Sequence, residues 1–512
     1  MTQLIVIAFY MGLLLGLAWL AGRWSRGTAS DYFVAERSIG SFMFLMSIFG
    51  TTMTAFSIVG STGESFRIGI GVYGMIASSS CLVHTAIFFF VGIRLWAIGK
   101  QYGFVTQIQY FRDRFESNAL GWLLFPVLVV LVIPYLMIGL LGAGAVINSL
   151  TTNAFPVIFA TTGGGIPPWL SEFVVSSVIL LYIFVGGLRA AVWANTLQTC
   201  IFVTACLITF GVIAHALGGI EAASRSVVAT NPNKMIRGEG VPQLYFLSYC
   251  LIPLSAGMFP HIFQHWLTAR SAKTFRLTLV AHPIFTLLVW LPCVLVGVWA
   301  TSAMLSDGSL VVPPDTPANT ELATMIQKLT GPLLGGLLGA GILAAIMSSL
   351  DSQFFCLGTM FTNDVVTHYF GKNRFDNRKM VLMTRLFIVA IIAVVYLFAL
   401  FEPRHVFTLG IWSFSGFVGL FPLVIAALYW RRATTTGATA SVVVAGSTWF
   451  LLFREAQYGA DRTYLFLDML PAATIFVAAS AALILVSLIT AAPSHETLRK
   501  YFPEATAVNS DL

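Results

Sequence analysis

Long apolar stretches recur along the whole chain, separated by short segments that carry Gly, Pro and charged residues. Each stretch is long enough to cross the roughly 30 Å hydrocarbon core of a bilayer as a helix. The first lacks a basic flank and a small-residue cleavage site, so we interpret it as a retained helix and not a signal peptide. The pattern predicts thirteen transmembrane helices, at residues 4–22, 41–62, 72–97, 119–148, 168–187, 193–216, 244–263, 277–300, 331–361, 381–401, 405–430, 437–453 and 464–490.

Composition supports this interpretation. Hydrophobic residues make up 57% of the 512 positions and charged residues 10%, with a mean hydropathy of +0.86. Soluble proteins average about half apolar and a quarter charged residues. The chain is therefore predicted to be an all-α integral membrane protein embedded in a lipid bilayer. The sequence contains no nucleotide-binding motif that would indicate ATP as an energy source.

Positive charge is distributed unevenly between the predicted loops. If the N-terminus lies outside, twenty of the 28 Lys and Arg fall in cytoplasmic segments. The remaining eight lie outside: Arg67, Arg225, Lys234, Arg237, Lys328, Arg404, Arg454 and Arg462. Because cytoplasmic loops retain Lys and Arg, this bias predicts an external N-terminus and a cytoplasmic C-terminus in the cell membrane. It also accounts for the net charge of +7 without a nucleic-acid partner.

Two predicted helices carry breaking residues near their middle. The second contains "GTTMTAFSIVGSTGES", with Gly50, Gly60 and Gly63, and the seventh contains "YCLIPLSAGMFPHIFQ", with Pro253 and Pro260. Breaks at membrane depth are tolerated where the backbone lines a cavity or is buried in protein. The two helices run in opposite directions, and such a pair indicates a binding site at the midplane of a secondary transporter. The alternative is that Gly and Pro are common in membrane helices.

The positions of these breaks predict a domain organisation with two five-helix repeats of inverted topology. The proposed segments are an N-terminal helix and loop (1–40), the first repeat (41–216), an external loop (217–243), the second repeat (244–430), two C-terminal helices (431–490) and a cytoplasmic tail (491–512).

The ninth predicted helix contains polar residues within an apolar run, in "AAIMSSLDSQFF". Ala345, Ser348 and Ser349 are spaced i, i+3 and i+4 and therefore share one helical face. Two hydroxyls and a carbonyl here, with two carbonyls freed by the broken second helix, would supply five oxygens for Na⁺. The alternative is that both serines only pack against neighbouring helices.

The segments "GILAAIMSSLDSQFF", "YIFVGGLRAAVWANTLQ" and "GTTMTAFSIVGSTGESFRIG" resemble the sodium:solute symporter family. The resemblance implies the leucine-transporter type of 5+5 inverted-repeat fold and Na⁺-driven uptake of a small organic solute. It also implies that the coupling Na⁺ is bound by the carbonyls of Gly50, Met53 and Ala345 and the hydroxyls of Ser348 and Ser349. The implied solute site lies beside it and comprises Thr52, Phe56, Ser57, Ser255, Pro260 and Gln264.

One departure from the family pattern concerns an acidic residue. Where the family signature has an acid in the sixth helix, this chain has Ala194 and Asn195, and a carboxylate stands instead at Asp351. An ionisable group at membrane depth indicates function. We expect Asp351 and Asn195 to share a second cation or a proton; the alternatives are a fixed pair with Arg189 or a position lining the inner vestibule.

These observations favour a transporter and not an enzyme, because a membrane enzyme would need clustered acids, histidines or a nucleophile within the spans. The expected cofactor is Na⁺, the expected partner a small-molecule solute such as an amino acid or monocarboxylate. No obligatory protein partner is evident. Two alternatives remain open: a proton-coupled carrier that uses Asp351, and a solute sensor.

Overall fold

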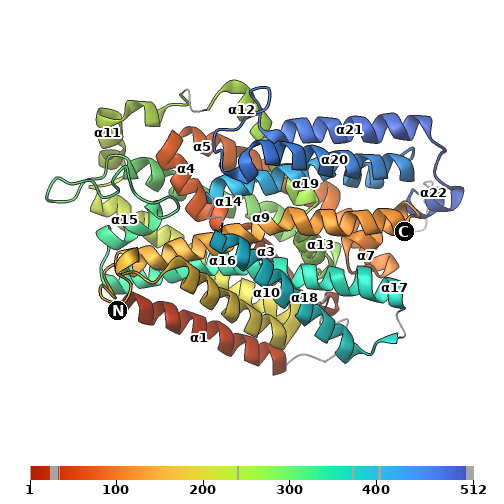
Figure 1. Cartoon of the computed structure of the whole chain (residues 1–512), viewed down its shortest axis with the longest axis horizontal. Coiled ribbons are helices and arrows are strands. Elements are labelled where there is room, and N and C mark those ends of the chain that lie inside the picture. The colour runs from red at the N-terminus through yellow and green to blue at the C-terminus, as the bar shows by residue number, and fades with distance from the viewer. Residues whose placement is uncertain are drawn as a thin grey trace, which may run out of the picture.

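We describe the chain from a computed structural model that covers residues 2–23, 33, 35–238, 241–371, 374–401 and 405–502. Within these ranges the fold is helical, with only three isolated β-bridges. The helices run along one long axis and form a bundle (Figure 1). This confirms the predicted all-α class.

By length and composition, nine helical segments of the described chain can cross a membrane, or up to eleven if each of two bent pairs counts as one span. Two shorter apolar segments, Thr2–Leu17 and Pro168–Phe184, lie at the first and fifth predicted spans. The total of thirteen remains a prediction. The principal elements are α1 (Thr2–Arg23), α5 to α7 (Gly71–Tyr102, interrupted by two π-turns), α9 (Asn118–Leu150), α10 (Pro168–Ala216), α14 (Phe275–Ala300), α16 (Pro332–Met360), α18 (Asn377–Phe401), α19 (Val406–Tyr429), α20 (Thr435–Glu455) and α21 (Pro471–Ile489).

The two bent pairs are the second and seventh predicted spans. α3 (Ser41–Thr52) and the segment Phe56–Ile68, which ends in α4 (Ser61–Ile68), meet at 60°. The segment Gln243–Gly257, which begins with α12 (Gln243–Tyr249), meets α13 (Pro260–Leu267) at 46°. The structure thus confirms that both helices are interrupted where Gly and Pro are concentrated.

α16 lies at the centre of the bundle, and every residue from Leu338 to Met360 is buried. Its neighbours include α1, α9, α10 and α18. This burial explains how an apolar run tolerates Ser348, Asp351 and Gln353: protein, not hydrocarbon, surrounds them.

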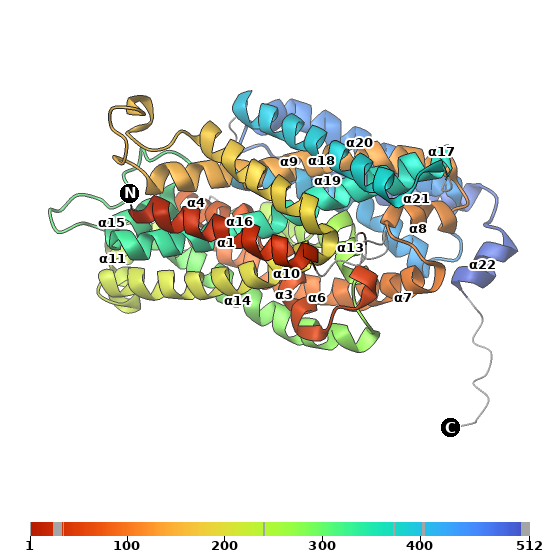
Figure 2. The same cartoon turned by 90° about the horizontal axis from the view of Figure 1, so that it is seen from below.

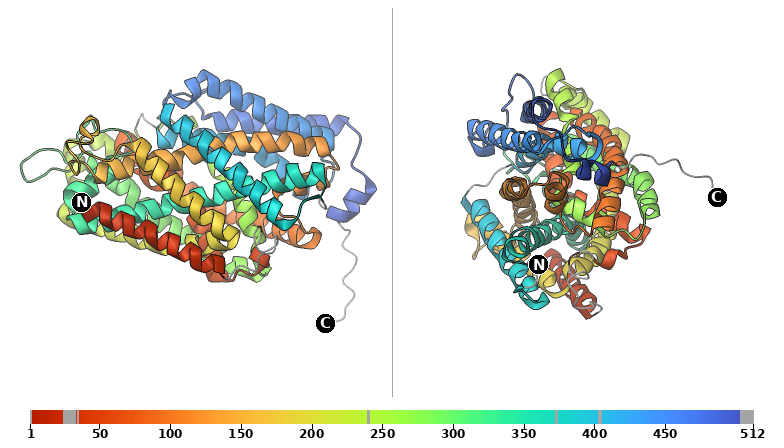
Figure 3. Two further views of the ribbon diagram at one scale, coloured as in Figure 1. Left: turned by 60° about the horizontal axis from the view of Figure 1, so that its bottom comes forward. Right: turned by 90° about the vertical axis from the view of Figure 1, so that its right-hand side faces the viewer.

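The start of α1 and the C-terminal helix α22 (His495–Tyr501) lie at opposite ends of the bundle (Figures 1 and 2). α20 and α21 pack together against α19 on one side, and α1 lies along another (Figures 1 and 3). α20 and α21 therefore lie at the periphery, and the broken helices and α16 occupy the centre.

The structure revises several predicted boundaries. The fifth and sixth spans follow each other directly in α10 and are divided by a kink at Gly187, where φ 57° and ψ −151° are not helical; the apolar segments on its two sides are Pro168–Phe184 and Ala191–Ala216. The last span begins at Pro471 and not at residue 464. The segment interpreted as an external loop, 217–243, contains the helix α11 (Ile220–Thr230), and a further helix, α15 (Glu321–Leu329), lies between the eighth and ninth predicted spans.

Candidate functional site

The second span breaks at Met53, where the backbone adopts an extended conformation with φ −91° and ψ 115°. In a continuous helix the carbonyl of Gly50 would accept a hydrogen bond from the N–H of Thr54. That N–H points instead to the hydroxyl of Ser57, at 3.5 Å. The break therefore leaves the Gly50 carbonyl available to a partner from another helix.

Ser348 of α16 is that partner. Its hydroxyl lies 2.8 Å from the carbonyl oxygen of Gly50 and 2.9 Å from that of Ala345, and the side chain is fully buried. A hydroxyl carries one hydrogen and can satisfy only one carbonyl fully. Three oxygens thus converge where a cation would bind all three, and the predicted residues Gly50, Ala345 and Ser348 are brought together.

Gly50 permits this approach because it has no side chain. A Cβ at this position would stand 2.3 Å from the hydroxyl oxygen of Thr199 on α10 and 3.6 Å from Cβ of Ser348. Thr199 itself donates to the carbonyl of Met46 at 2.8 Å. α3, α10 and α16 therefore meet at closest packing around the predicted ion position.

The other two predicted sodium ligands lie beside this cluster without a direct bond to it. Met53 is fully buried at the break. The hydroxyl of Ser349 accepts a hydrogen bond from the amide of Gln353 at 2.6 Å. A hydroxyl oxygen has two lone pairs, so this bond leaves one of them for an ion.

Asp351 is fully buried and belongs to a polar network between α10 and α16. Its carboxylate accepts hydrogen bonds from the hydroxyl of Tyr182 at 3.0 Å and from that of Ser352 at 3.1 Å. The amide of Asn195 donates to the same Ser352 hydroxyl at 2.9 Å, and a ring nitrogen of His265 lies 3.1 Å from it. Ser352 therefore links the two residues predicted to share a second cation or proton.

The alternative partner, Arg189, has a side chain outside the described residues. Tyr182 and Ser352 were not singled out from the sequence, although both stand within the quoted family-like segments. Each places a polar group in an otherwise apolar span, and this feature of the sequence could have indicated that they take part in the site.

A cavity with an empty volume of about 440 Å³ lies between the two broken spans. Four of the six predicted solute residues line it: Thr52, Phe56, Ser57 and Ser255. The lining also includes His84, Tyr135, Tyr249 and Trp290, which the sequence analysis did not select. Its lining has hydroxyl, imidazole and indole groups but no Asp, Glu, Lys or Arg, which suits a small polar molecule without a fixed partner of opposite charge.

Pro260 and Gln264 are not among the lining residues. Pro260 is the first residue of α13, where its missing N–H is tolerated. Gln264 is buried, and its amide donates to the carbonyl of Phe33 at 3.1 Å and to the hydroxyl of Thr359 at 3.2 Å. In this conformation Gln264 holds helices together and does not face the cavity.

An aromatic layer separates this cavity from a second one, called the outer cavity because it lies toward the side that the sequence analysis predicts to be external. Phe56 stacks on Phe407 of α19, with ring centroids 4.8 Å apart, and meets Phe414 edge to face at 5.0 Å. Phe407 also lines the outer cavity of about 850 Å³, together with Glu64 and Arg67, which form an ion pair with bonds of 2.6 and 3.0 Å. The path to the central cavity is thus closed on this side.

The profile of the sodium:solute symporter family matches residues 32–445. The chain belongs to the sodium:solute symporter family. It is therefore a sodium-coupled membrane transporter of a small solute and not an enzyme, as the sequence analysis predicted.

Individual relatives within the family are distant but cover most of the chain. The sodium/pantothenate symporter of Haemophilus influenzae is 21% identical over 83% of this chain and 84% of its own length. The sodium/proline symporter of the same organism is 24% identical over 92% of each chain.

Among solved structures, the substrate-bound outward-open state of a Na⁺-coupled sialic acid symporter has a TM-score of 0.75 at 17% identity, over 96% of this chain and 99% of that one. A crystal structure of MhsT in complex with L-phenylalanine has a TM-score of 0.50 at 13% identity, over 88% of this chain and 98% of that one. The fold is that of the leucine-transporter type, as predicted.

Proposed function

We propose that the coupling Na⁺ binds between the broken second span and α16, at the carbonyls of Gly50, Met53 and Ala345 and the hydroxyls of Ser348 and Ser349. The observation that carries this proposal is the position of Ser348 between two carbonyls that compete for its one hydrogen. Five neutral oxygens replace the hydration shell of Na⁺ without adding a fixed charge.

The transported molecule, in this proposal, is a small polar organic solute held in the central cavity. Membership of a family whose relatives are named for pantothenate, proline and sialic acid supports this class. Thr52 and Thr54, on either side of the proposed sodium ligand Met53, line the cavity, so the break in the second span joins the two sites. Each ligand then raises the affinity of the other by the same factor.

Uptake follows from the proposed orientation, with the N-terminus outside and the C-terminus in the cytoplasm. A negative interior favours Na⁺ release inside by about 2.3 kcal/mol per charge per 100 mV. With one Na⁺ per solute, a neutral or zwitterionic solute gives a current and a monoanion gives none.

A second candidate role concerns Asp351, which we propose shares a cation or proton with Asn195 through Ser352. The network of Tyr182, Asp351, Ser352 and Asn195 supports it, because the described groups that bond the carboxylate of Asp351 are neutral hydroxyls. If a second cation binds, a monoanionic solute also becomes electrogenic.

The test uses the full chain in proteoliposomes on a solid-supported membrane. Currents are recorded after rapid addition of proline or glucose, which carry no net charge, in Na⁺ and in K⁺ at two pH values. Uptake of radiolabelled pantothenate and pyruvate, which are monoanions, is measured under the same conditions. Currents that need Na⁺ and vanish in Ser348→Ala support the proposed site. Currents that persist in K⁺ and follow the pH gradient favour the proton-coupled carrier.

A further inference from the structure

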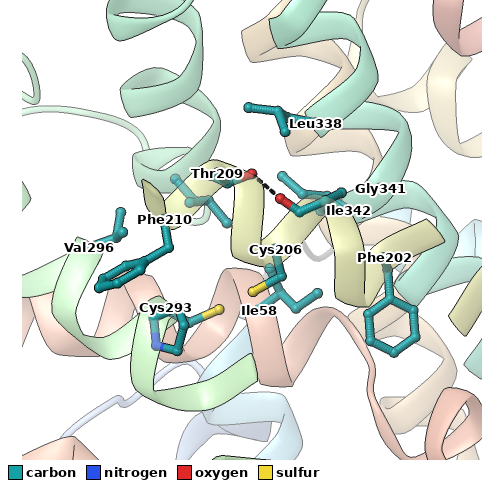
Figure 4. Close-up of a pocket in the computed structure, with 13 residues that line it drawn as sticks. Ile58, Phe202, Cys206, Thr209, Phe210, Cys293, Val296, Leu338, Gly341 and Ile342 are labelled. Carbon is teal, nitrogen blue, oxygen red and sulfur yellow. Dashed lines mark hydrogen bonds between the residues drawn. The ribbon is translucent and has the colours of Figure 1, made fainter. Parts of the chain in front are cut away.

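A third cavity, drawn in Figure 4, shares no lining residue with the solute site. It has an empty volume of about 350 Å³ and lies between α10, α14, α16 and the beginning of the outer half of the second span. Most of the lining is apolar, including Ile58, Phe202 and Ile342. The hydroxyl of Thr209 donates to the carbonyl of Ala205 within its own helix at 2.7 Å and is therefore occupied.

Two cysteines from different helices meet in this cavity. Cys206 of α10 and Cys293 of α14 are both free thiols, and their sulfur atoms point toward one another (Figure 4). Cys293 is buried and Cys206 is half-buried. The thiol of Cys206 also approaches the carbonyl of Val289 at 3.7 Å. The cavity thus presents two soft ligands and no free hard ligand of comparable strength.

We propose that Cys206 and Cys293 together bind one soft, thiophilic cation of the d¹⁰ type, such as Hg²⁺, Ag⁺ or Cu⁺, in a two-coordinate site. Each thiol releases its proton to water as a metal–sulfur bond forms, and no electron is transferred. Thiolate ligands select soft cations, so this site discriminates against Na⁺. Because both thiols are already placed by the fold, the second bond forms at high effective concentration.

The site is connected to the broken second span. The backbone carbonyl of Cys293 accepts a hydrogen bond from the hydroxyl of Thr62 of α4 at 3.1 Å. Ile58, just after the break, lines the cavity itself. A metal bridge would fix α10 to α14 and, through Thr62, to the outer half of the second span. Bound soft cation is therefore expected to arrest transport; this consequence alone rests on the proposed function.

The test loads the purified full chain with HgCl₂ and then washes it with excess free cysteine, which removes mercury from single thiols. The wild type is expected to retain about one mercury per chain, and Cys206→Ala and Cys293→Ala less than about a tenth of that. Cys250→Ala, which removes a half-buried thiol elsewhere, is the matched control and should retain as much as the wild type. The proposal is overturned if the wild type retains no more mercury than the two variants.

X-ray absorption at the mercury edge of the wild type provides a measurement that does not depend on the variants folding. Two sulfur ligands per mercury are expected, and a single sulfur ligand contradicts the site. Neither readout requires transport, so a failure here is distinguishable from a failure of the proposed coupling mechanism. Inhibition of Na⁺-dependent current by HgCl₂ in the wild type but not in Cys293→Ala would then establish the link to the second span.

Discussion

The hydroxyl of Ser348, in the unbroken helix α16, lies 2.8 Å from the carbonyl oxygen of Gly50, three residues before the second span breaks at Met53. This contact joins α3 to α16 across the middle of the bundle. A bound cation would replace the shared hydrogen by direct bonds to all the oxygens. The contact therefore offers the most direct test of the sodium site.

Ser348→Ala is expected to abolish stabilisation by Na⁺. A ligand at 100 times its dissociation constant stabilises the folded state by about 2.7 kcal/mol. The measurement is thermal unfolding in Na⁺ against K⁺ at equal ionic strength. Ser441→Ala removes a buried hydroxyl that bonds the carbonyl of Ala479 in the C-terminal helices, and it should keep the full Na⁺ effect. Equal Na⁺ effects in Ser348→Ala and wild type would place the ion elsewhere.

Gly50→Ala should destabilise the protein and prevent Na⁺ binding, because the new methyl group would stand 2.3 Å from the hydroxyl oxygen of Thr199. Overpacking of this kind costs about 1–3 kcal/mol. Gly211→Ala on α10 is the control, since no atom lies within 4 Å of its Cβ position. Folding of both variants is compared by chemical denaturation in detergent, and equal stability of the two would refute the packing argument.

Asp351→Asn preserves the shape of the side chain and removes its charge. If Asp351 holds a proton, the variant should lose the pH dependence of uptake. If it holds a second cation, the variant should move one charge fewer per cycle. In both cases the Na⁺ effect at Ser348 should persist. Tyr182→Phe removes the 3.0 Å hydrogen bond to the carboxylate. It should change the pH dependence of uptake, or the charge moved per cycle, by a smaller amount. Unchanged pH dependence and stoichiometry in Asp351→Asn would assign the carboxylate a structural role.

Phe407→Ala should open the outer path, because it removes the ring stacked on Phe56 at 4.8 Å. An aromatic pair contributes about 0.5–1.5 kcal/mol beyond its area burial, which changes the open population roughly 2- to 12-fold. The measurement is labelling of Ser57→Cys, in the central cavity, by a membrane-impermeant maleimide added outside. Phe453→Ala, on the peripheral α20, should leave the labelling rate unchanged.

The C-terminal helix α22 should detach at acidic pH. Glu116, in the turn after α8 (Gln107–Arg114), accepts hydrogen bonds from the hydroxyls of Ser494 and Thr497, and these bonds lower the pKa of its carboxyl. A lowered pKa in the folded state stabilises docking above the ordinary glutamate pKa, and the stabilisation is lost as pH falls through the lowered value.

Hydrogen exchange of residues 495–501 between pH 7 and pH 3 measures this detachment. Protection should fall at the acidic end in the wild type. In Glu116→Gln, which cannot ionise, protection should be weaker at pH 7 and change less with acidification. A wild-type tail whose protection does not change with pH would contradict the expectation.

The sequence by itself determined the class of the protein, because hydrocarbon admits only helices with internally paired backbones. The helix positions, the two interrupted spans at Gly50–Gly63 and Pro253–Pro260, and the serines of α16 all follow from residue type and spacing. These signals depend only on a residue and its neighbours in the sequence, so they can be recognised before the contacts with other helices are known.

Contacts between distant segments were decided only by the tertiary structure. Asp351 bonds Tyr182, 169 positions away, and Gln264 turns from the predicted cavity to Phe33 and Thr359. His84, Tyr135 and Trp290 line the cavity. The sequence did not predict this, because spans that are buried on all sides have no polar face, and their pattern does not show which side of each helix points inward. The sequence thus specified which oxygens were available, and the packing of α3, α10 and α16 decided which of them meet.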